Sequence, residues 1–123
     1  MARGPLELRT PDGRTLRCKL ADGFTSRFLG LMGRSALAED EALLLVPGGS
    51  IHTFFMRFAL DAVYVNVDGT VLRVARDVRP WHLSRAPKGT KFVLELTAGQ
   101  ASAHGLEDGA RLDLDGGWDS LSR

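Results

Sequence analysis

The sequence predicts a mainly β fold of the α+β kind: a compact antiparallel sheet or barrel-like domain with two short helices. Short stretches of alternating polar and apolar residues outnumber helical ones, and two pairs of them flank tight turns, at Pro11-Asp12-Gly13 and Asp68-Gly69. The 123 residues, 44% of them hydrophobic, are enough for one domain with its own core. We expect that domain to span residues 1–115 and residues 116–123 to form a frayed tail.

The first predicted element is a hairpin over residues 6–20, "LELRTPDGRTLRCKL". Leucines alternate with polar residues on both sides of the turn, where Pro11 fixes φ and Gly13 tolerates positive φ. Cys18 is part of this alternation and is the only cysteine. We therefore expect a small buried hydrophobe rather than a nucleophile, and neither an internal disulfide nor a cysteine-based zinc site.

A short helix is predicted over residues 25–32, because Phe24, Phe28, Leu31 and Met32 recur with helical spacing. The continuous apolar run "ALLLV" that follows has the length of a buried strand.

The second predicted hairpin covers residues 62–76 and turns at Asp68-Gly69. The run "KFVLEL" predicts a further strand. After it, Thr97 and Gln100 have the spacing of a capping box, and Gly105 closes a helix of about two turns. A final short strand, "ARLDL", precedes the tail.

Charge is distributed unevenly along the chain. The formal net charge is only +1, which argues against the broad basic surface of a nucleic-acid-binding protein. Six cations against one aspartate give residues 71–92 a charge of +5, and residues 105–122 carry −4. Two interpretations remain open: two solvated faces that attract each other, or a basic patch that binds an anionic ligand.

The sequence contains no apolar run near the roughly 20 residues that span a bilayer, and its first residues lack the apolar region of a secretory signal. We therefore expect no membrane partner. A cytoplasmic location is the default expectation, with an export signal trimmed from the chain as the alternative.

Asp61 interrupts an apolar stretch between Leu60 and Ala62. The apolar residues have even numbers up to Leu60 and odd numbers from Val63 onward, so the phase slips at this point and predicts a bulge, a bend or two strands. A kink frees backbone N–H groups, which a carboxylate accepts readily. We predict that Asp61 is buried, ionised and bonded to backbone N–H groups or to an arginine. The alternative is an acid, a base or a ligand-anchoring group in a cleft.

Metal and cofactor sites are not predicted. His52, His82 and His104 lie in different elements without the spacing of a metal motif. "GLMGRS" lacks the full spacing and the lysine of a phosphate-binding loop, and no serine has the context of a hydrolase nucleophile. In the loop after residue 78, Trp81 and His82 lie beside prolines and arginines. This tryptophan either covers a pocket or ligand, or folds down as a lid on the core.

Four blocks of the sequence resemble one family, and they run in order from about Leu16 to Leu114: "TSRFLGLMGRSAL", "HTFFMRFALDAVYVNVDGTV", "RPW" and "FVLELTAGQASAHGLEDGARL". The family is that of domain of unknown function 192, a group of small uncharacterised prokaryotic proteins. The resemblance implies a compact, mainly β fold with short helices and brings no established activity. The motif positions that it suggests are Gly30, Leu31, Met32, Arg34, Thr53, Met56, Arg57, Asp61, Pro80, Trp81, Glu95 and Gly99.

Two functions follow as hypotheses. The first is a non-enzymatic module that binds a small, anionic molecule or a protein partner in a cleft between residues 53–61 and 79–85. The second is a small hydrolase- or lyase-like enzyme that uses Asp61 with His52 or His82. The first is favoured, since no nucleophile–base pair is recognisable. Its expected ligand-binding residues are Arg34, Thr53, Met56, Arg57, Asp61, Trp81 and His82.

Overall fold

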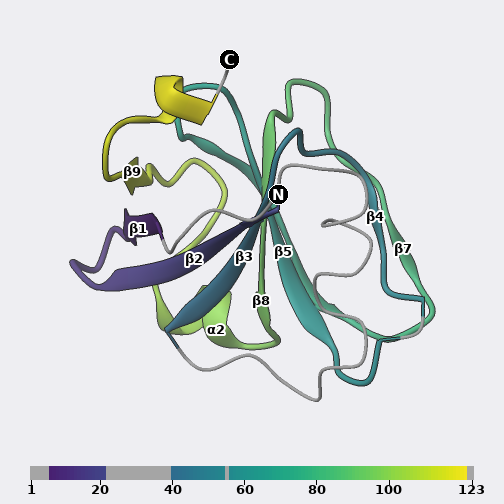
Figure 1. Cartoon of the computed structure of the whole chain (residues 1–123). Helices are drawn as coiled ribbons and strands as arrows, with labels where there is room; N and C mark the ends of the chain where they lie inside the picture. The colour runs from purple at the N-terminus through teal and green to yellow at the C-terminus, as the bar shows by residue number, and fades with distance from the viewer. Residues whose placement is uncertain (1–5, 22–39, 55, 122–123) are drawn as a thin grey trace.

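The computed structural model describes residues 6–21, 40–54 and 56–121 (Figure 1). Its main sheet has seven strands in the order β6-β5-β8-β3-β2-β1-β9, and β4 and β7 form a separate two-stranded ribbon. The strands are β1 (Leu6–Arg9), β2 (Thr15–Ala21), β3 (Glu41–Leu45), β4 (Ile51–His52), β5 (Leu60–Val65), β6 (Val71–Val78), β7 (Leu83–Ser84), β8 (Phe92–Thr97) and β9 (Asp113–Leu114). The fold is therefore mainly β, as predicted.

Most neighbouring strands are antiparallel, and both predicted hairpins are confirmed. β1 pairs with β2 from Leu6 opposite Cys18 onward, and β5 pairs with β6 across the Asp68-Gly69 turn. The exception to the expected antiparallel sheet is the pair β2–β3, which is parallel. A parallel pair requires a long crossover connection, and residues 22–40 supply that length between the two strands.

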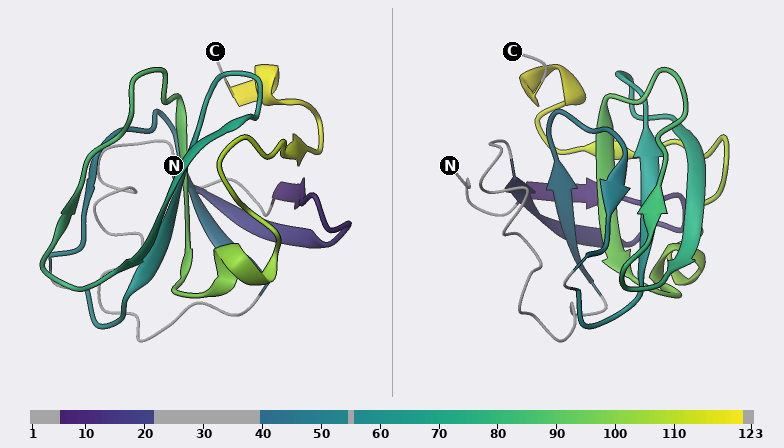
Figure 2. Two further views of the ribbon diagram at one scale, coloured as in Figure 1. Left: turned by 180° about the vertical axis from the view of Figure 1, so that it is seen from behind. Right: turned by 90° about the vertical axis from the view of Figure 1, so that its right-hand side faces the viewer.

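The main sheet curls, so that its two faces pack against different parts of the chain (Figure 2). β5 is buried along its whole length because its alternate residues enter two separate cores. Val63 and Val65 belong to the core that includes β1, β2 and the C-terminal residues. Leu60, Ala62 and Tyr64 belong to the second core, which β4 joins through Ile51.

The predicted helices are only partly as expected. The helix predicted over residues 25–32 lies outside the described residues. The C-terminal helix exists as α2 (Gln100–Ala103), but it has four residues, and its N-cap is Gly99, with φ of 95°. The predicted capping box is wrong because Thr97 is the last residue of β8. No helix within the described ranges is long and apolar enough to cross a membrane.

As far as residue 121, the C-terminal tail is not frayed as predicted. Residues Trp118–Leu121 form a 3-10 helix, η1, and the side chains of Trp118 and Leu121 are buried. The indole ring packs against Phe92 with 4.8 Å between ring centroids, and its Nε1–H donates to the Leu112 carbonyl oxygen at 2.8 Å. A single large aromatic residue therefore anchors a segment whose composition otherwise resembles a loop.

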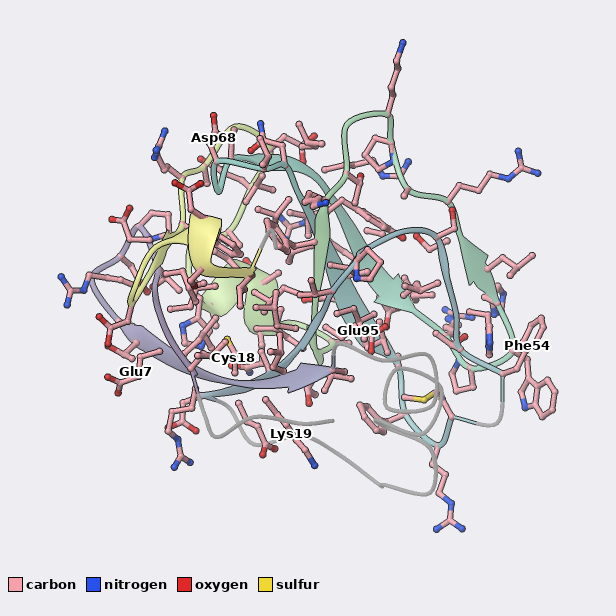
Figure 3. All side chains as sticks on the ribbon, turned by 45° about the horizontal axis from the view of Figure 1, so that its top comes forward. Glu7, Cys18, Lys19, Phe54, Asp68 and Glu95 are labelled. Atoms are coloured by element: carbon pink, nitrogen blue, oxygen red, sulfur yellow. The ribbon has the colours of Figure 1, made fainter. Side chains whose placement is uncertain are left out.

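Cys18 lies inside the first core, as predicted (Figure 3). Burial raises the pKa of its thiol to about 12. An unfolded thiol loses its proton near pH 8.5, so the unfolded chain binds fewer protons than the folded chain above that pH. On account of this group, the free energy of unfolding should fall by about 1.4 kcal/mol per pH unit between roughly pH 9 and 12.

Urea melts from pH 8 to 11 measure this slope, and Cys18→Ala is the control. Burial also raises the pKa of Tyr64, so this group too lowers the free energy of unfolding near pH 11. This second decrease is expected in both the wild type and Cys18→Ala. An equal slope in wild type and Cys18→Ala would contradict the assignment to Cys18.

Candidate functional site

Asp61 is buried with 1% of its surface exposed, and its two carboxylate oxygens accept three backbone hydrogen bonds. Oδ1 accepts from the Asp77 N–H at 2.9 Å. Oδ2 accepts from the N–H groups of Gly99 and Ala101, each at 3.0 Å. The prediction of a buried carboxylate that binds backbone N–H groups is thus confirmed. Asp61 caps α2 from a distant strand, in the role that the sequence assigned to Thr97.

The predicted slip in register is a bulge, and the extra residue lies on the partner strand. Leu60 pairs with Val78 and Ala62 pairs with Ala75, so β6 has one more residue than β5 in this interval. Asp77, within the bulge, has φ of 52°, and its N–H turns toward Asp61. The carboxylate therefore fixes the bulge in β6 and the start of α2 at the same time.

The structure places the predicted partners of Asp61 elsewhere. Arg57 is exposed, and backbone N–H groups rather than this guanidinium satisfy the carboxylate. His52 lies in β4 with its ring 4.8 Å from that of Phe54. His82 contacts the Pro80 carbonyl oxygen through Nδ1 at 2.9 Å.

Thr53 is fully buried and holds the turn before β7 in place. Its hydroxyl donates to the Arg79 carbonyl oxygen and accepts from the His82 N–H at 2.9 Å. Its backbone N–H donates to the His82 carbonyl oxygen at 2.9 Å, and its own carbonyl oxygen accepts from the Trp81 N–H at 3.0 Å. Thr53 therefore positions the residues around Trp81 and is enclosed by them.

Trp81 extends from that turn with 59% of its surface exposed. Its ring stacks on Phe54 with 5.7 Å between centroids, and Phe54 lies at the outer rim of the molecule (Figure 3). The backbone of Trp81 is left-handed, with φ of 68°, which is an unfavourable conformation for a residue with a large side chain. This exposure contradicts the interpretation of Trp81 as a lid folded onto the core, whereas its role as a cover over a pocket or ligand stays a prediction.

An open groove of about 460 Å³ lies between β6 and β7. Basic side chains surround it: Arg73 from β6, Arg79 from the turn, and Arg85 after β7. The other lining residues are Ala75, Asp77, Val78, His82, Leu83 and Ser84. The basic patch of residues 71–92 is therefore concentrated, in part, around one depression.

The groove is held together by side-chain bonds between its two walls. Arg73 donates through Nη2 to the Arg85 carbonyl oxygen at 3.1 Å, and its guanidinium lies 5.5 Å from the centre of the Tyr64 ring. The Tyr64 hydroxyl donates to Ser84 Oγ at 2.6 Å. These contacts connect β5, β6 and β7 and fix the width of the groove. Among the described residues, Asp77 is the one carboxylate in its lining, and it lies 4.0 Å from Arg79 Nε.

Of the six predicted ligand-binding residues that the structure describes, His82 alone is in the lining of this groove. Thr53 supports its turn, Trp81 is adjacent in sequence, and Met56 packs at the margin of the second core. Arg34 lies outside the described residues. The sequence predictions missed Arg73, Arg79 and Arg85 as individual site residues, although the charge of residues 71–92 indicated their region.

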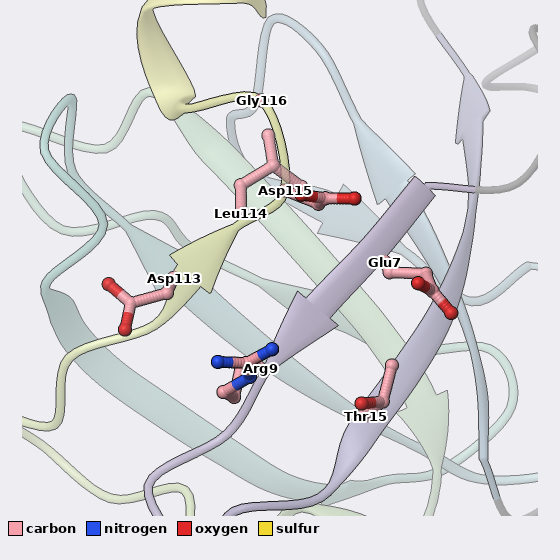
Figure 4. Close-up of a pocket in the computed structure, with 7 residues that line it drawn as sticks. All are labelled: Glu7, Arg9, Thr15, Asp113, Leu114, Asp115 and Gly116. Atoms are coloured by element: carbon pink, nitrogen blue, oxygen red, sulfur yellow. The ribbon is translucent and has the colours of Figure 1, made fainter.

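A second cavity, of about 230 Å³, lies at the opposite edge of the main sheet, among β1, β2 and β9 (Figure 4). Three carboxylates, those of Glu7, Asp113 and Asp115, line it together with Arg9. In the part of the chain that the structure describes, no three His, Cys, Asp or Glu side chains are placed to hold a metal ion. The acidic C-terminal region is therefore divided: Asp113 and Asp115 lie at this edge, whereas Asp108 accepts a hydrogen bond from the Val74 N–H of β6 at 3.1 Å.

Comparisons with known proteins agree with this fold. A UPF0127 protein of Pyrococcus furiosus is 31% identical over 118 residues, which cover 86% of this chain and 95% of that protein. A UPF0127 protein of Thermococcus sibiricus is 30% identical over 104 residues, covering 80% of this chain and 66% of that protein.

Solved structures show the same architecture. A protein of Sinorhizobium meliloti, named as a candidate transcription regulator, has a TM-score of 0.78 at 27% identity, covering 89% of this chain and 92% of that one. A protein of unknown function from Novosphingobium aromaticivorans also has a TM-score of 0.78, at 24% identity, covering 89% of this chain and 83% of that one. The family model DUF192, described as "Uncharacterized ACR", matches residues 7–114. The chain therefore belongs to the DUF192 family of uncharacterised proteins.

Proposed function

We propose that this protein is a non-enzymatic binding module that holds an anionic group in the groove between β6 and β7. The observation that supports this most strongly is the presence of Arg73, Arg79 and Arg85 among the residues that line one open depression. Guanidinium groups bind carboxylates and phosphates through paired hydrogen bonds, and three of them around 460 Å³ form a site of matching charge.

The arrangement of the groove favours a ligand with a compact anionic group. Arg73 is already oriented by its bond to the Arg85 carbonyl oxygen, so less side-chain entropy is lost when a ligand binds to it. Asp77 opposes an anion, but its contact with Arg79 Nε is long, at 4.0 Å, and both side chains are largely exposed. An incoming phosphate or carboxylate can therefore take Asp77's place beside Arg79.

The enzymatic alternative has less support. A general acid or base must reach the reacting group, and Asp61 is buried with both oxygens occupied by backbone N–H groups. Asp61 is also absent from the lining of the groove, whereas His82 is part of it. We therefore assign Asp61 a structural role in this proposal.

Sulfate or phosphate is expected to raise the melting temperature more than chloride does at equal ionic strength. At ten times its dissociation constant a ligand stabilises the fold enough for a shift of about 5 °C. Arg79→Gln and Arg85→Gln should each reduce the shift, and the double variant should abolish it. Arg17→Gln is the matched control, because this arginine is exposed on β2, far along the sheet.

Equal responses to sulfate, phosphate and chloride in the wild-type protein would refute the proposal. The same would follow if Arg17→Gln reduced the shift as much as the double variant, since the effect would then reflect overall charge.

A cytoplasmic location remains our expectation for this chain. One similar structure, at 17% identity and a TM-score of 0.56, covers 24% of a protein of Burkholderia pseudomallei that is named as a candidate exported protein. Fractionation of cells that express the full-length gene decides between cytoplasm and export.

A further inference from the structure

We infer that the partner of this groove is an acidic, extended segment of another protein, which docks along β7 as an added strand. The inference rests on the proposed anion-binding groove and names the class of molecule that carries the anionic groups. Its evidence comes from three features of the β4–β7 ribbon and the residues around it: exposed apolar side chains, a strand edge that faces away from β4, and an excess of positive charge.

The apolar side chains are Trp81 and Leu83, with 59% and 71% of their surfaces exposed. They lie on either side of His82, where the turn that contains Trp81 leads into β7. Phe54 stacks on Trp81 and widens the same surface. Exposed apolar clusters of this kind mark interaction sites.

The backbone of Leu83 offers an edge for pairing. Thr53 N–H donates to the His82 carbonyl oxygen at 2.9 Å, so these two residues form a hydrogen-bonded pair of the antiparallel ribbon. The next pair, His52 with Leu83, is consequently of the non-hydrogen-bonded type. The N–H and carbonyl groups of Leu83 therefore point away from β4, where an extended peptide can bind them.

The strained backbone of Trp81 suggests that its exposure has a use. A left-handed conformation is costly for a bulky residue, and here Thr53 holds the turn on both sides of it. The fold thus keeps a large aromatic side chain in the solvent at the expense of backbone strain. Such strain is found at functional sites more often than elsewhere.

The charge around the ribbon selects an acidic partner. Residues 79–91 contain Arg79, Arg85, Lys88 and Lys91 and no acidic residue. Two of these cations line the groove beside Leu83. An extended segment on β7 would therefore place alternate side chains on the apolar surface and others toward the arginines.

A peptide fits these features better than a lipid surface or a small anion. A bilayer cannot extend β7 by a further strand, because it has no backbone N–H and carbonyl groups to pair with those of Leu83. A small anion in the groove would leave Trp81 exposed, since that side chain is not part of the lining.

Selection of random dodecapeptides displayed on phage, against the immobilised full-length protein, tests this inference. We expect enriched peptides that are rich in Asp and Glu and carry apolar residues at alternate positions. Two N-methylated versions of a selected synthetic peptide should then differ. Methylation of the alternate backbone nitrogens that face β7 should weaken binding by about tenfold or more, and methylation of the nitrogens that face away from β7 should weaken it much less.

Two variants of the ribbon check the site. Trp81→Gly removes the ring and relieves the positive φ, and Leu83→Ser removes an exposed side chain, so both proteins should fold with melting temperatures near that of the wild type. Each should reduce peptide affinity by about tenfold or more. Val67→Ser is the matched control, because Val67 is 53% exposed but lies beside another turn, and it should bind as the wild type does.

The outcomes separate this inference from the proposed function. Phosphate stabilisation that is lost in Arg79→Gln and Arg85→Gln, together with no enriched peptide, would overturn the docking inference and leave the anion site intact. A third outcome is that the protein binds vesicles with 30% phosphatidylglycerol, that Trp81→Gly abolishes this binding, and that no peptide is enriched. The surface around Trp81 and Leu83 would then be a membrane-binding surface instead. If the protein binds neither phosphate nor any peptide, both the proposed function and the docking inference are overturned.

Discussion

Asp61→Ala is expected to lower the free energy of unfolding by about 2–3 kcal/mol, since a buried hydrogen-bond donor left unsatisfied costs about 1–3 kcal/mol and a partly buried one costs less, because water can reach it. Three N–H groups lose their acceptor at once, those of Asp77, Gly99 and Ala101. The loss should affect both the bulge of β6 and the start of α2, because one carboxylate holds both. Urea melts of the wild type and the variant measure the difference.

Asp61→Asn refines this prediction, because its amide keeps a single oxygen. That oxygen is best used at the Oδ2 position, where it accepts from Gly99 and Ala101. The amide NH₂ then faces the Asp77 N–H, donor against donor. We expect a smaller loss of stability than in Asp61→Ala, and faster hydrogen exchange confined to the Asp77 amide and its neighbours.

Asp77→Asn is the matched control for both variants. It removes a nearby charge from a side chain that is 63% exposed, and asparagine tolerates positive φ, so its cost should stay within about 0.5 kcal/mol. A fully stable Asp61→Ala would show that the carboxylate is present for function rather than for the fold. The enzymatic hypothesis would then regain support.

Trp118→Ala is expected to destabilise the protein by about 3–5 kcal/mol, the usual cost of removing a large buried aromatic side chain. The indole packs on Phe92, donates to the Leu112 carbonyl oxygen and is 7% exposed. It also fills the space over Gly69, where an added Cβ would lie 2.3 Å from Nε1. The residue therefore joins the tail to the turn between β5 and β6.

The control for Trp118→Ala is the same substitution at Trp81. Because Trp81 is 59% exposed, its replacement should cost about 1 kcal/mol or less. A Trp118→Ala variant as stable as Trp81→Ala would restore the original expectation of a frayed tail from residue 116.

Local patterns were sufficient to predict most of the strands and one buried contact, although β7 lies in a stretch that was predicted as a loop. Alternation and turn residues identified both hairpins. The change of parity at Asp61 indicated a bulge, a bend or two strands, whose free N–H groups a carboxylate would accept. In each case the signal lies within a few residues, because side chains alternate along a strand and glycine marks positive φ.

The errors have a common cause in long-range contacts. Thr97 has the right spacing for a capping box, but pairing with Leu60 keeps it in β8, and Asp61 takes over the capping role from a distant position. Trp118 is fixed by Phe92, which lies far away in sequence. The groove likewise forms only because β6 and β7 lie close together in the fold. The sequence alone predicted the positive charge of the residues that line it, but not that they enclose a groove.

The central claim is that the arginines between β6 and β7 bind an anion. Titration of the ¹⁵N-labelled protein with phosphate at constant ionic strength, followed by two-dimensional NMR, tests it most directly. We predict saturable shifts of the backbone amides of the residues that line the groove, namely 73, 75, 77–79 and 82–85, and the loss of these shifts in the Arg79→Gln, Arg85→Gln double variant. Shifts that are absent, do not saturate or map to another surface would contradict the claim.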